Sequence, residues 1–136
     1  MTLLELMMKV RRYTRDTEGS LFTEVDVKDF CNEGINRIRK ISELKSMKEL
    51  ENNHDTPILL PEQYHYLISI YGASRCFTQD EQNTLGQMFM NEFESKLMEL
   101  EREIKNGSII ITDPDGNPVV STDVEDAVKN VYFKRG

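Results

Sequence analysis

Few side chains in this sequence could do chemistry, and their surroundings favour structural roles. Cys31 and Cys76 both lie in segments with helical periodicity, and their spacing does not match a metal site. We expect both to be buried, reduced thiols, because free cysteine is among the most buried residue types. His54 and His65 each stand apart from any ligand pattern, so we expect both at the surface.

Common catalytic motifs are absent from the sequence. It contains no phosphate-binding G-x-x-x-x-G-K-[ST] loop, no H-E-x-x-H pair, no C-x-x-C pair and no G-x-S-x-G elbow. Carboxylates are plentiful, as at Glu99, Glu101 and Glu103, but on a charged helix they form a solvated face. The sequence therefore predicts no enzymatic activity and no cofactor.

One acidic turn resembles a calcium loop. Asp113, Asp115 and Asn117 alternate as the first ligands of such a loop do. The glycine falls before the sixth position that such a loop needs, however, and no glutamate stands where the loop needs its bidentate ligand. We therefore expect a turn without a metal.

Length and charge limit the classes of protein that fit. The chain has 136 residues, which suits one domain, and its net charge is −7 from 24 acidic and 17 basic residues. This balance disfavours nucleic-acid binding as the main task, because carboxylates and phosphates repel each other. The sequence has no run of 18 apolar residues, and Glu5 places a charge near its start. We therefore expect neither a membrane span nor a signal peptide.

The elements that would position any site are helices with well-marked starts. Thr2 and Glu5 have the spacing of a capping box, in which each side chain bonds the other residue's backbone N–H. Thr23 is placed as the N-cap of a second helix, with Asp26 at its third position and Phe22 before it as a hydrophobic staple.

The second predicted helix has a wide apolar face and few polar residues near it. Gly34 lies on that face, where it leaves room for another backbone to come close. We expect Asn32 and Asn36 to be surface residues or to make local hydrogen bonds.

Two longer helices fit the stretch that ends at Gly107. Pro61 suits a first helical position, because its missing N–H would have no partner there. Helical spacing continues to Phe77, and capping residue types at 78–80 interrupt it. A longer apolar seam follows and ends at Gly107, which can adopt the left-handed conformation that closes a helix. The predicted fold class is mainly α: a small antiparallel bundle of about four helices.

The helix predicted to start at Pro61 is apolar on two sides. Tyr66, Ile70 and Phe77 form a stripe roughly opposite its other apolar face, at ~100° per residue. These residues are candidates for an interface between subunits. The alternative is that they contact helices of the same chain, since the first two helices also need apolar surfaces to cover.

After Gly107 the pattern changes from helical to extended. Residues 109–112 and 119–121 flank the turn formers at 113–118, which predicts a C-terminal β-hairpin followed by an extended tail. Pro118 would restrict the returning strand to a sheet edge, because it cannot donate a ladder hydrogen bond.

This pattern divides the chain into a helical domain, 1–107, and a hairpin and docking tail, 108–136. A lone hairpin is only marginally stable, and this region is too apolar for a free tail. We therefore expect it to bind a partner, with the contacts made by Ile109, Ile110, Ile111, Val119, Val120, Tyr132, Phe133, Lys134 and Arg135.

The order of these motifs resembles a known family. The shared features are the short first helix, the start at Phe22 and Thr23, the charged loop, and three segments: Phe30-Cys31-Asn32-Glu33-Gly34-Ile35, Leu60-Pro61-Glu62-Gln63-Tyr64-His65-Tyr66-Leu67 and Gln87-Met88-Phe89-Met90-Asn91-Glu92-Phe93-Glu94-Ser95-Lys96-Leu97. From Thr2 to about Gly107 the chain is similar to the head-to-tail connector proteins of tailed bacteriophages, also called adaptor or head completion proteins. Related members often carry tryptophan where Phe22 stands.

The resemblance implies a structural role without catalysis. Such proteins are helical and form a ring, typically twelve-fold, beneath the portal protein of the filled head. The ring extends the channel through which DNA leaves without specific binding. The implied partners are the portal, neighbouring copies, and a downstream stopper or tail protein, with no membrane. The implied location is the head-to-tail interface of the virion, assembled in the host cytoplasm from a chain that is monomeric when isolated.

Two other classes of protein fit the composition less directly. A small helical DNA-binding regulator would use the basic residues of the first two helices, which are Arg11, Arg12, Arg37, Arg39 and Lys40. Its duplex affinity would fall steeply with salt. The second alternative is a helical protein-interaction scaffold that binds one partner helix.

Overall fold

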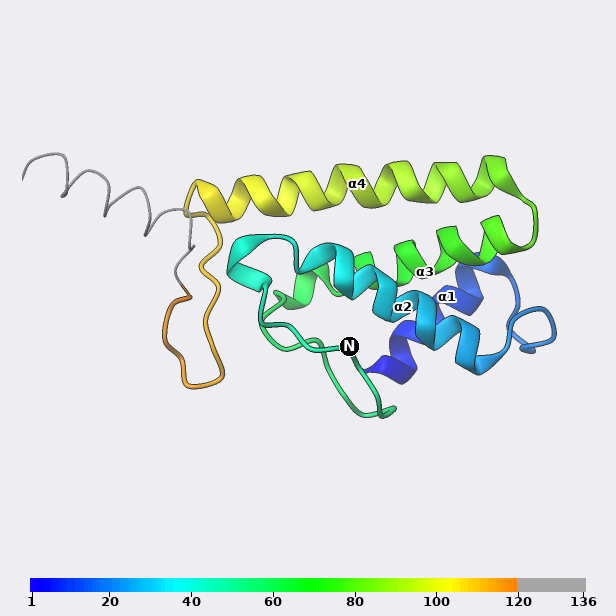
Figure 1. The fold of residues 1–136 in the computed structure, drawn as a ribbon, viewed down its shortest axis with the longest axis horizontal. Coiled ribbons are helices and arrows are strands. Elements are labelled where there is room, and N and C mark those ends of the chain that lie inside the picture. Colours follow the sequence, from blue (N-terminus) through cyan, green and yellow to red (C-terminus); the bar gives the residue numbers. More distant parts are fainter. Residues whose placement is uncertain (120–136) are drawn as a thin grey trace, which may run out of the picture.

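The computed structural model describes residues 1–119. In this range the chain forms two short 3-10 helices, Ser42–Leu44 and Glu62–Tyr64, and four α-helices: α1 (Leu3–Thr14), α2 (Glu24–Ile38), α3 (Tyr66–Gln79) and α4 (Asn83–Lys105). α3 and α4 run antiparallel along the molecule, and α1 and α2 lie beside α3, away from most of α4 (Figure 1). The predicted mainly α bundle is confirmed. No helix within residues 1–119 is long and apolar enough to cross a membrane.

The first helix start forms as its sequence predicts. The Thr2 hydroxyl accepts from the Glu5 N–H at 3.2 Å, and a Glu5 carboxylate oxygen accepts from the Thr2 N–H at 3.0 Å. The capping box is therefore complete. At α2, the Thr23 hydroxyl accepts from the Asp26 N–H at 3.1 Å, as an N-cap should.

The start of α3 differs from the prediction. Pro61 is followed by a 3-10 turn, in which the N–H groups of Tyr64 and His65 donate to carbonyls three residues earlier, and the α-helix begins only at Tyr66. The tighter turn accompanies burial of the Tyr64 and His65 side chains, which are 5% and 6% exposed.

α3 is the central element, because it packs against each of the other three helices. Ile70 and Phe77 are both buried inside the chain, and the Phe77 ring lies 5.4 Å from the Phe89 ring of α4. Tyr66 is half-buried against the same core. Of the two alternatives for this stripe, the structure supports contact with helices of the same chain.

Small residues let α1 and α2 come close to α3. A Cβ atom added at Gly72 would lie 2.9 Å from a methyl carbon of Val10 on α1, closer than real Cβ contacts. Ser69 on α3 donates its hydroxyl hydrogen to the Leu6 carbonyl of α1 at 2.8 Å. On α2, a Cβ added at Gly34 would lie 3.1 Å from Tyr71 Cβ, so the expected close approach at Gly34 is confirmed.

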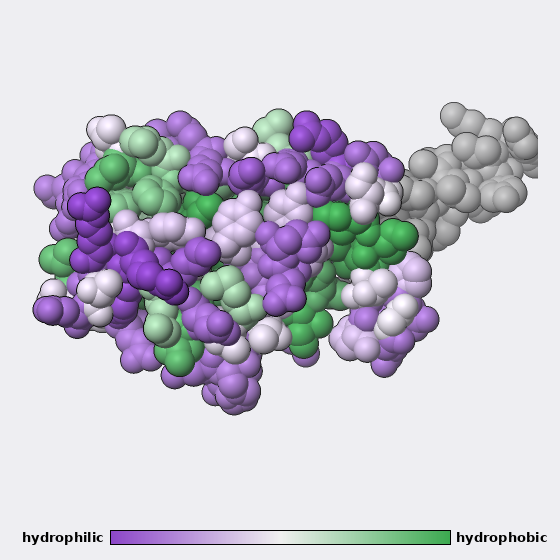
Figure 2. Space-filling model, turned by 180° about the vertical axis from the view of Figure 1, so that it is seen from behind, coloured by the Kyte–Doolittle hydropathy of each residue, from purple (hydrophilic) through white to green (hydrophobic). Residues whose placement is uncertain are grey.

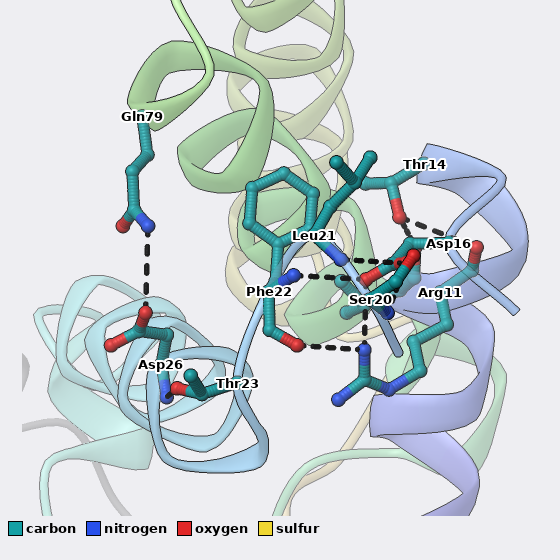
Figure 3. Close-up of polar contacts among 10 residues, drawn as sticks. Arg11, Thr14, Asp16, Ser20, Leu21, Phe22, Thr23, Asp26 and Gln79 are labelled. Atoms are coloured by element: carbon teal, nitrogen blue, oxygen red, sulfur yellow. Dashed lines mark hydrogen bonds and ion pairs between the residues drawn. The ribbon is translucent and has the colours of Figure 1, made fainter. Parts of the chain in front are cut away.

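One buried carboxylate holds the turn between α1 and α2 (Figure 3). Asp16 accepts from the backbone N–H groups of Ser20, Leu21 and Phe22 at 2.9, 3.1 and 3.0 Å, and it pairs with Arg11 at 3.0 Å. Burial by itself raises the pKa of the Asp16 carboxyl, but the three N–H donors and the Arg11 cation outweigh burial. The pKa of Asp16 therefore lies below its ordinary value.

The segment after α4 folds back onto the helices. Its antiparallel pairing is limited to an isolated bridge between Thr112 and Pro118, with the Val119 N–H donating to the Ile111 carbonyl at 2.8 Å. Ile111 is 3% exposed and belongs to the core, while Ile109 and Val119 are half-buried against it. This segment of residues 108–119 is called the C-terminal turn below.

The predicted C-terminal β-hairpin is not formed within the described residues. Pro118 has no N–H to donate, so the ladder cannot continue through it. The Asp113 side chain instead accepts from the N–H groups of Asp115 and Asn117, which closes the connection into a compact turn. The predicted strand residues Val120 and Ser121, and the tail that follows, lie outside the described residues.

Asp16→Asn should destabilise the fold in a pH-dependent way. At neutral pH the amide loses the charge that Arg11 and the N–H groups stabilise, and hydrogen bonds to charged groups contribute about 1.5–3 kcal/mol. Because the folded-state pKa is lowered, this stability is present above the unfolded pKa and is lost as pH falls through the folded value. Urea unfolding at pH 7 and near pH 3 measures the difference, with the exposed Asp29→Asn as control. An equal loss at both pH values would contradict the assignment.

Two truncations should separate the C-terminal turn from the residues beyond it. A chain that ends at Gly107 lacks Ile111, and burial of such a side chain contributes about 1.5–3 kcal/mol. We expect it to unfold at lower urea concentration than the full chain, with helices still visible by circular dichroism. A chain that ends at Val119 keeps Ile111 and should lose much less stability. Equal stability of both truncated chains would show that the burial of Ile111 contributes little.

Candidate docking site

The predicted partner-binding residues fall into three groups. Ile111 is in the core, Ile109 and Val119 are half-buried, and Ile110 is 69% exposed. Seen from behind, the molecule has a continuous apolar area next to the C-terminal turn (Figure 2). Among the predicted partner-binding residues that the structure describes, only Ile110 is exposed enough to contact a partner directly. The remaining members lie outside the described residues, namely Val120, Tyr132, Phe133, Lys134 and Arg135.

The two histidines have different environments. His54 is at the surface as expected, with its side chain 86% exposed. The surface prediction is wrong for His65, whose ring lies with Nδ1 2.8 Å from the Met1 amino nitrogen and Nε2 2.9 Å from the Leu60 carbonyl oxygen. These partners fit a neutral ring that donates from Nε2, and burial lowers the pKa of His65. In the sequence, His65 lies between Tyr64 and Tyr66, two residues of the predicted apolar stripes, and this was the available signal for a buried position.

Thiol and metal chemistry find no support in this part of the chain. Cys31 and Cys76 are buried free thiols, as predicted, and burial raises the pKa of both to about 12. At neutral pH they are therefore poor nucleophiles. No group of three or more histidine, cysteine or acidic side chains within residues 1–119 is arranged to hold a metal ion.

A long loop, residues 45–61, is anchored to α2 by Asn32. The Asn32 amide donates to the Leu50 carbonyl at 2.9 Å and accepts from the Leu50 N–H at 2.8 Å. Arg39, at the end of α2, donates to the Met47 carbonyl at 3.0 Å. Asn32 is only 8% exposed, so its predicted surface or local role is wrong. Its position beside Cys31, at the margin of a wide apolar face, was the available signal.

The same loop also closes the start of α1. The Asp55 carboxylate accepts from the N–H groups of Glu51 and Asn52 at 3.0 and 2.8 Å, which shapes the loop. The Asp55 carbonyl accepts from the Leu3 N–H at 2.8 Å, one of the groups at a helix start that lack a partner within the helix. These backbone contacts fix the loop against the bundle.

The anchored loop and the C-terminal turn together line a pocket of about 740 Å³. We call it the loop pocket. Its apolar lining comes from Met47, Leu50, Ile58, Leu59 and Val119, and its charged lining from Lys48, Glu49, Asp55 and Asp113. The charged side chains sum to −2, from one lysine and three carboxylates. An open pocket with both apolar and acidic walls suits a segment with apolar and basic side chains.

No family model, curated protein or solved structure matches this chain. The sequence resemblance to connector proteins therefore stays a hypothesis. Within the described residues, the loop pocket and the exposed Ile58 and Ile110 near it form the candidate docking site.

Asn32→Ala should loosen the loop that forms the pocket wall. It leaves the buried N–H and carbonyl of Leu50 without their partner, and an unsatisfied buried group costs about 1–3 kcal/mol. We expect lower stability to urea and faster amide hydrogen exchange at residues 47–50. The matched control is Asn36→Ala on the same helix, because the Asn36 bond to Glu49 is solvent-exposed. If the two variants behaved alike, the Asn32 clamp would not be what holds the loop.

Proposed function

We propose that this chain is a subunit of a head-to-tail connector of a tailed bacteriophage, a ring beneath the portal protein that extends the DNA channel. The observation that carries the proposal is that the segment from Thr2 to about Gly107 resembles the connector proteins in its helix starts and apolar positions. The four α-helices within residues 1–119 are compatible with that family's helical character.

Four of the nine large apolar side chains that are exposed within the described residues are compatible with a ring. In a closed ring with head-to-tail contacts, each subunit presents two different patches to its two neighbours. Leu21 and Val25, at the α1–α2 turn, are 60% and 67% exposed. Ile58, on the loop beside the C-terminal turn, is 60% exposed, and Ile110, within that turn, is 69% exposed. The two turns lie at opposite ends of the long axis (Figure 1).

A DNA-binding regulator is less well supported, because several of its candidate cations are engaged inside the molecule. Arg11 pairs with Asp16, Arg37 with Glu94, and Arg39 donates to a backbone carbonyl. An electrophoretic or anisotropy titration with duplex DNA at low and physiological salt distinguishes the two functions. Tight binding with a steep salt dependence would favour the regulator.

The proposal predicts assembly that depends on the portal. Alone at micromolar concentration, the chain should scatter light as a monomer, because no large self-complementary apolar patch is evident in the described residues. Mixed with DNA-filled, portal-bearing heads encoded by the same genome, it should co-sediment with them.

Charge placed on one of the two patches should block this assembly. We expect Val25→Glu to prevent co-sedimentation, since it buries an unpaired carboxylate between neighbours. Met98→Glu, at a 69% exposed position on α4, is the matched control and should assemble. A stable closed ring of the isolated chain would contradict portal-dependent assembly. Absence of portal and capsid genes near this one, together with no binding to heads, would remove the connector hypothesis.

A further inference from the structure

The chain leaves the described residues at the edge of the loop pocket. Val119 is the last described residue, and its side chain is part of the pocket lining. The sequence continues for 17 residues, from 120 to 136. Whatever conformation they adopt, these residues are tethered directly at the pocket rim.

The end of that segment has side chains that match the pocket walls. Val131, Tyr132 and Phe133 form its most apolar run, and Lys134 and Arg135 follow at once. The pocket offers an apolar wall and a charge of −2 from its charged side chains, as described above. The two terminal cations therefore complement the pocket in sign and number.

We propose that the C-terminal segment of this chain docks into the loop pocket of the same molecule. Tyr132 and Phe133 would contact Ile58 and the neighbouring apolar lining, and Lys134 and Arg135 would face the pocket carboxylates. The proposal does not rest on the connector function.

The length of the tether permits this arrangement. Tyr132 lies thirteen positions after Val119, and an extended chain spans up to ~3.3–3.6 Å per residue, or roughly 45 Å in all. The segment can therefore leave the rim and return to it. A short flexible tether gives an effective concentration of about millimolar, which favours the pocket of the same molecule over that of another at micromolar protein.

The carboxylates have capacity for these extra contacts. Glu49 accepts one solvent-exposed hydrogen bond from Asn36, and a carboxylate has about four acceptor sites. Asp55 and Asp113 each accept two backbone N–H bonds within their own turns. Docking would cover Ile58, which is 60% exposed in the described structure. A partner that binds this end of the molecule would then have to displace the segment.

Paramagnetic NMR on the full chain tests the proposal. Gly136→Cys provides a site for a nitroxide label, and Cys31 and Cys76 should remain unlabelled because they are buried. The chain is labelled at the methyl groups of isoleucine and methionine. We expect the nitroxide to broaden the Ile58 and Met47 signals strongly and to leave Met88 and Met98, on the outer face of α4, sharp.

Five further samples, namely two matched pairs and one mixture, make the test specific. Ile58→Glu should abolish the broadening at Met47, whereas the matched surface variant Met98→Glu should not. A second pair acts from the tail: Lys134→Glu with Arg135→Glu should abolish the broadening, and Lys129→Glu should preserve it. The last sample is a mixture of two chains. One carries the nitroxide but no isotope label, and the other carries the isotope label but no nitroxide. We expect no broadening in this mixture.

Each other outcome overturns the inference. Sharp Ile58 and Met47 signals in the nitroxide-labelled chain would show that the segment does not occupy the pocket. Broadening that appears equally in the mixed sample would show that a second copy supplies the segment. Broadening that survives both Ile58→Glu and the double change Lys134→Glu with Arg135→Glu would show that the segment lies near the pocket without the proposed apolar and ionic contacts.

Discussion

The close approach of α1 to α3 is the constraint on which the other contacts depend. At Gly72 a single added carbon would meet Val10 at 2.9 Å, and Ser69 uses the short distance to donate to the Leu6 carbonyl. With α1 held this close, the opposite flank of α3 remains free for α4, where Ser74 donates to the Gly86 carbonyl at 2.7 Å. Small residues therefore allow one short helix to contact all three others.

Irregular segments of this domain are fixed by single polar side chains that bond backbone groups. Asp16 organises the α1–α2 turn, Asn32 holds the loop at Leu50, and Asp113 closes the C-terminal turn. Each bond contributes only about 0.5–1.5 kcal/mol net, more where a charge takes part, but leaving its buried partner unpaired costs more. The position of the segments that line the loop pocket thus depends on a few individual hydrogen bonds, whereas the helical bundle is held together by apolar packing.

What the sequence predicted well depends on contacts between near neighbours. The capping box at Thr2 and the N-cap at Thr23 act over three residues, so local pattern was enough to find these helix starts. The errors involve distant partners. Asn32 is buried because its amide bonds the backbone of Leu50, eighteen residues away. The C-terminal turn has an isolated bridge where a hairpin was predicted, and Ile111 anchors this turn to the helical core. The loop pocket arises from two segments about sixty residues apart in sequence, and no local pattern in either one reports the other.

The ion pairs between helices also shape the outer surface. Arg37 of α2 pairs with Glu94 of α4, and Arg75 of α3 pairs with Glu33 of α2 at 3.2 Å. Being partly exposed, such pairs stabilise the domain only modestly. Each pair neutralises one cation and one carboxylate, so the pairs leave the net charge of −7 unchanged and remove two arginines from those available to an anion. If copies of this chain surround DNA, as proposed, their net negative charge would disfavour a tight grip on the phosphates. The same acidity would leave apolar patches and terminal basic residues as the parts best suited to contact a protein.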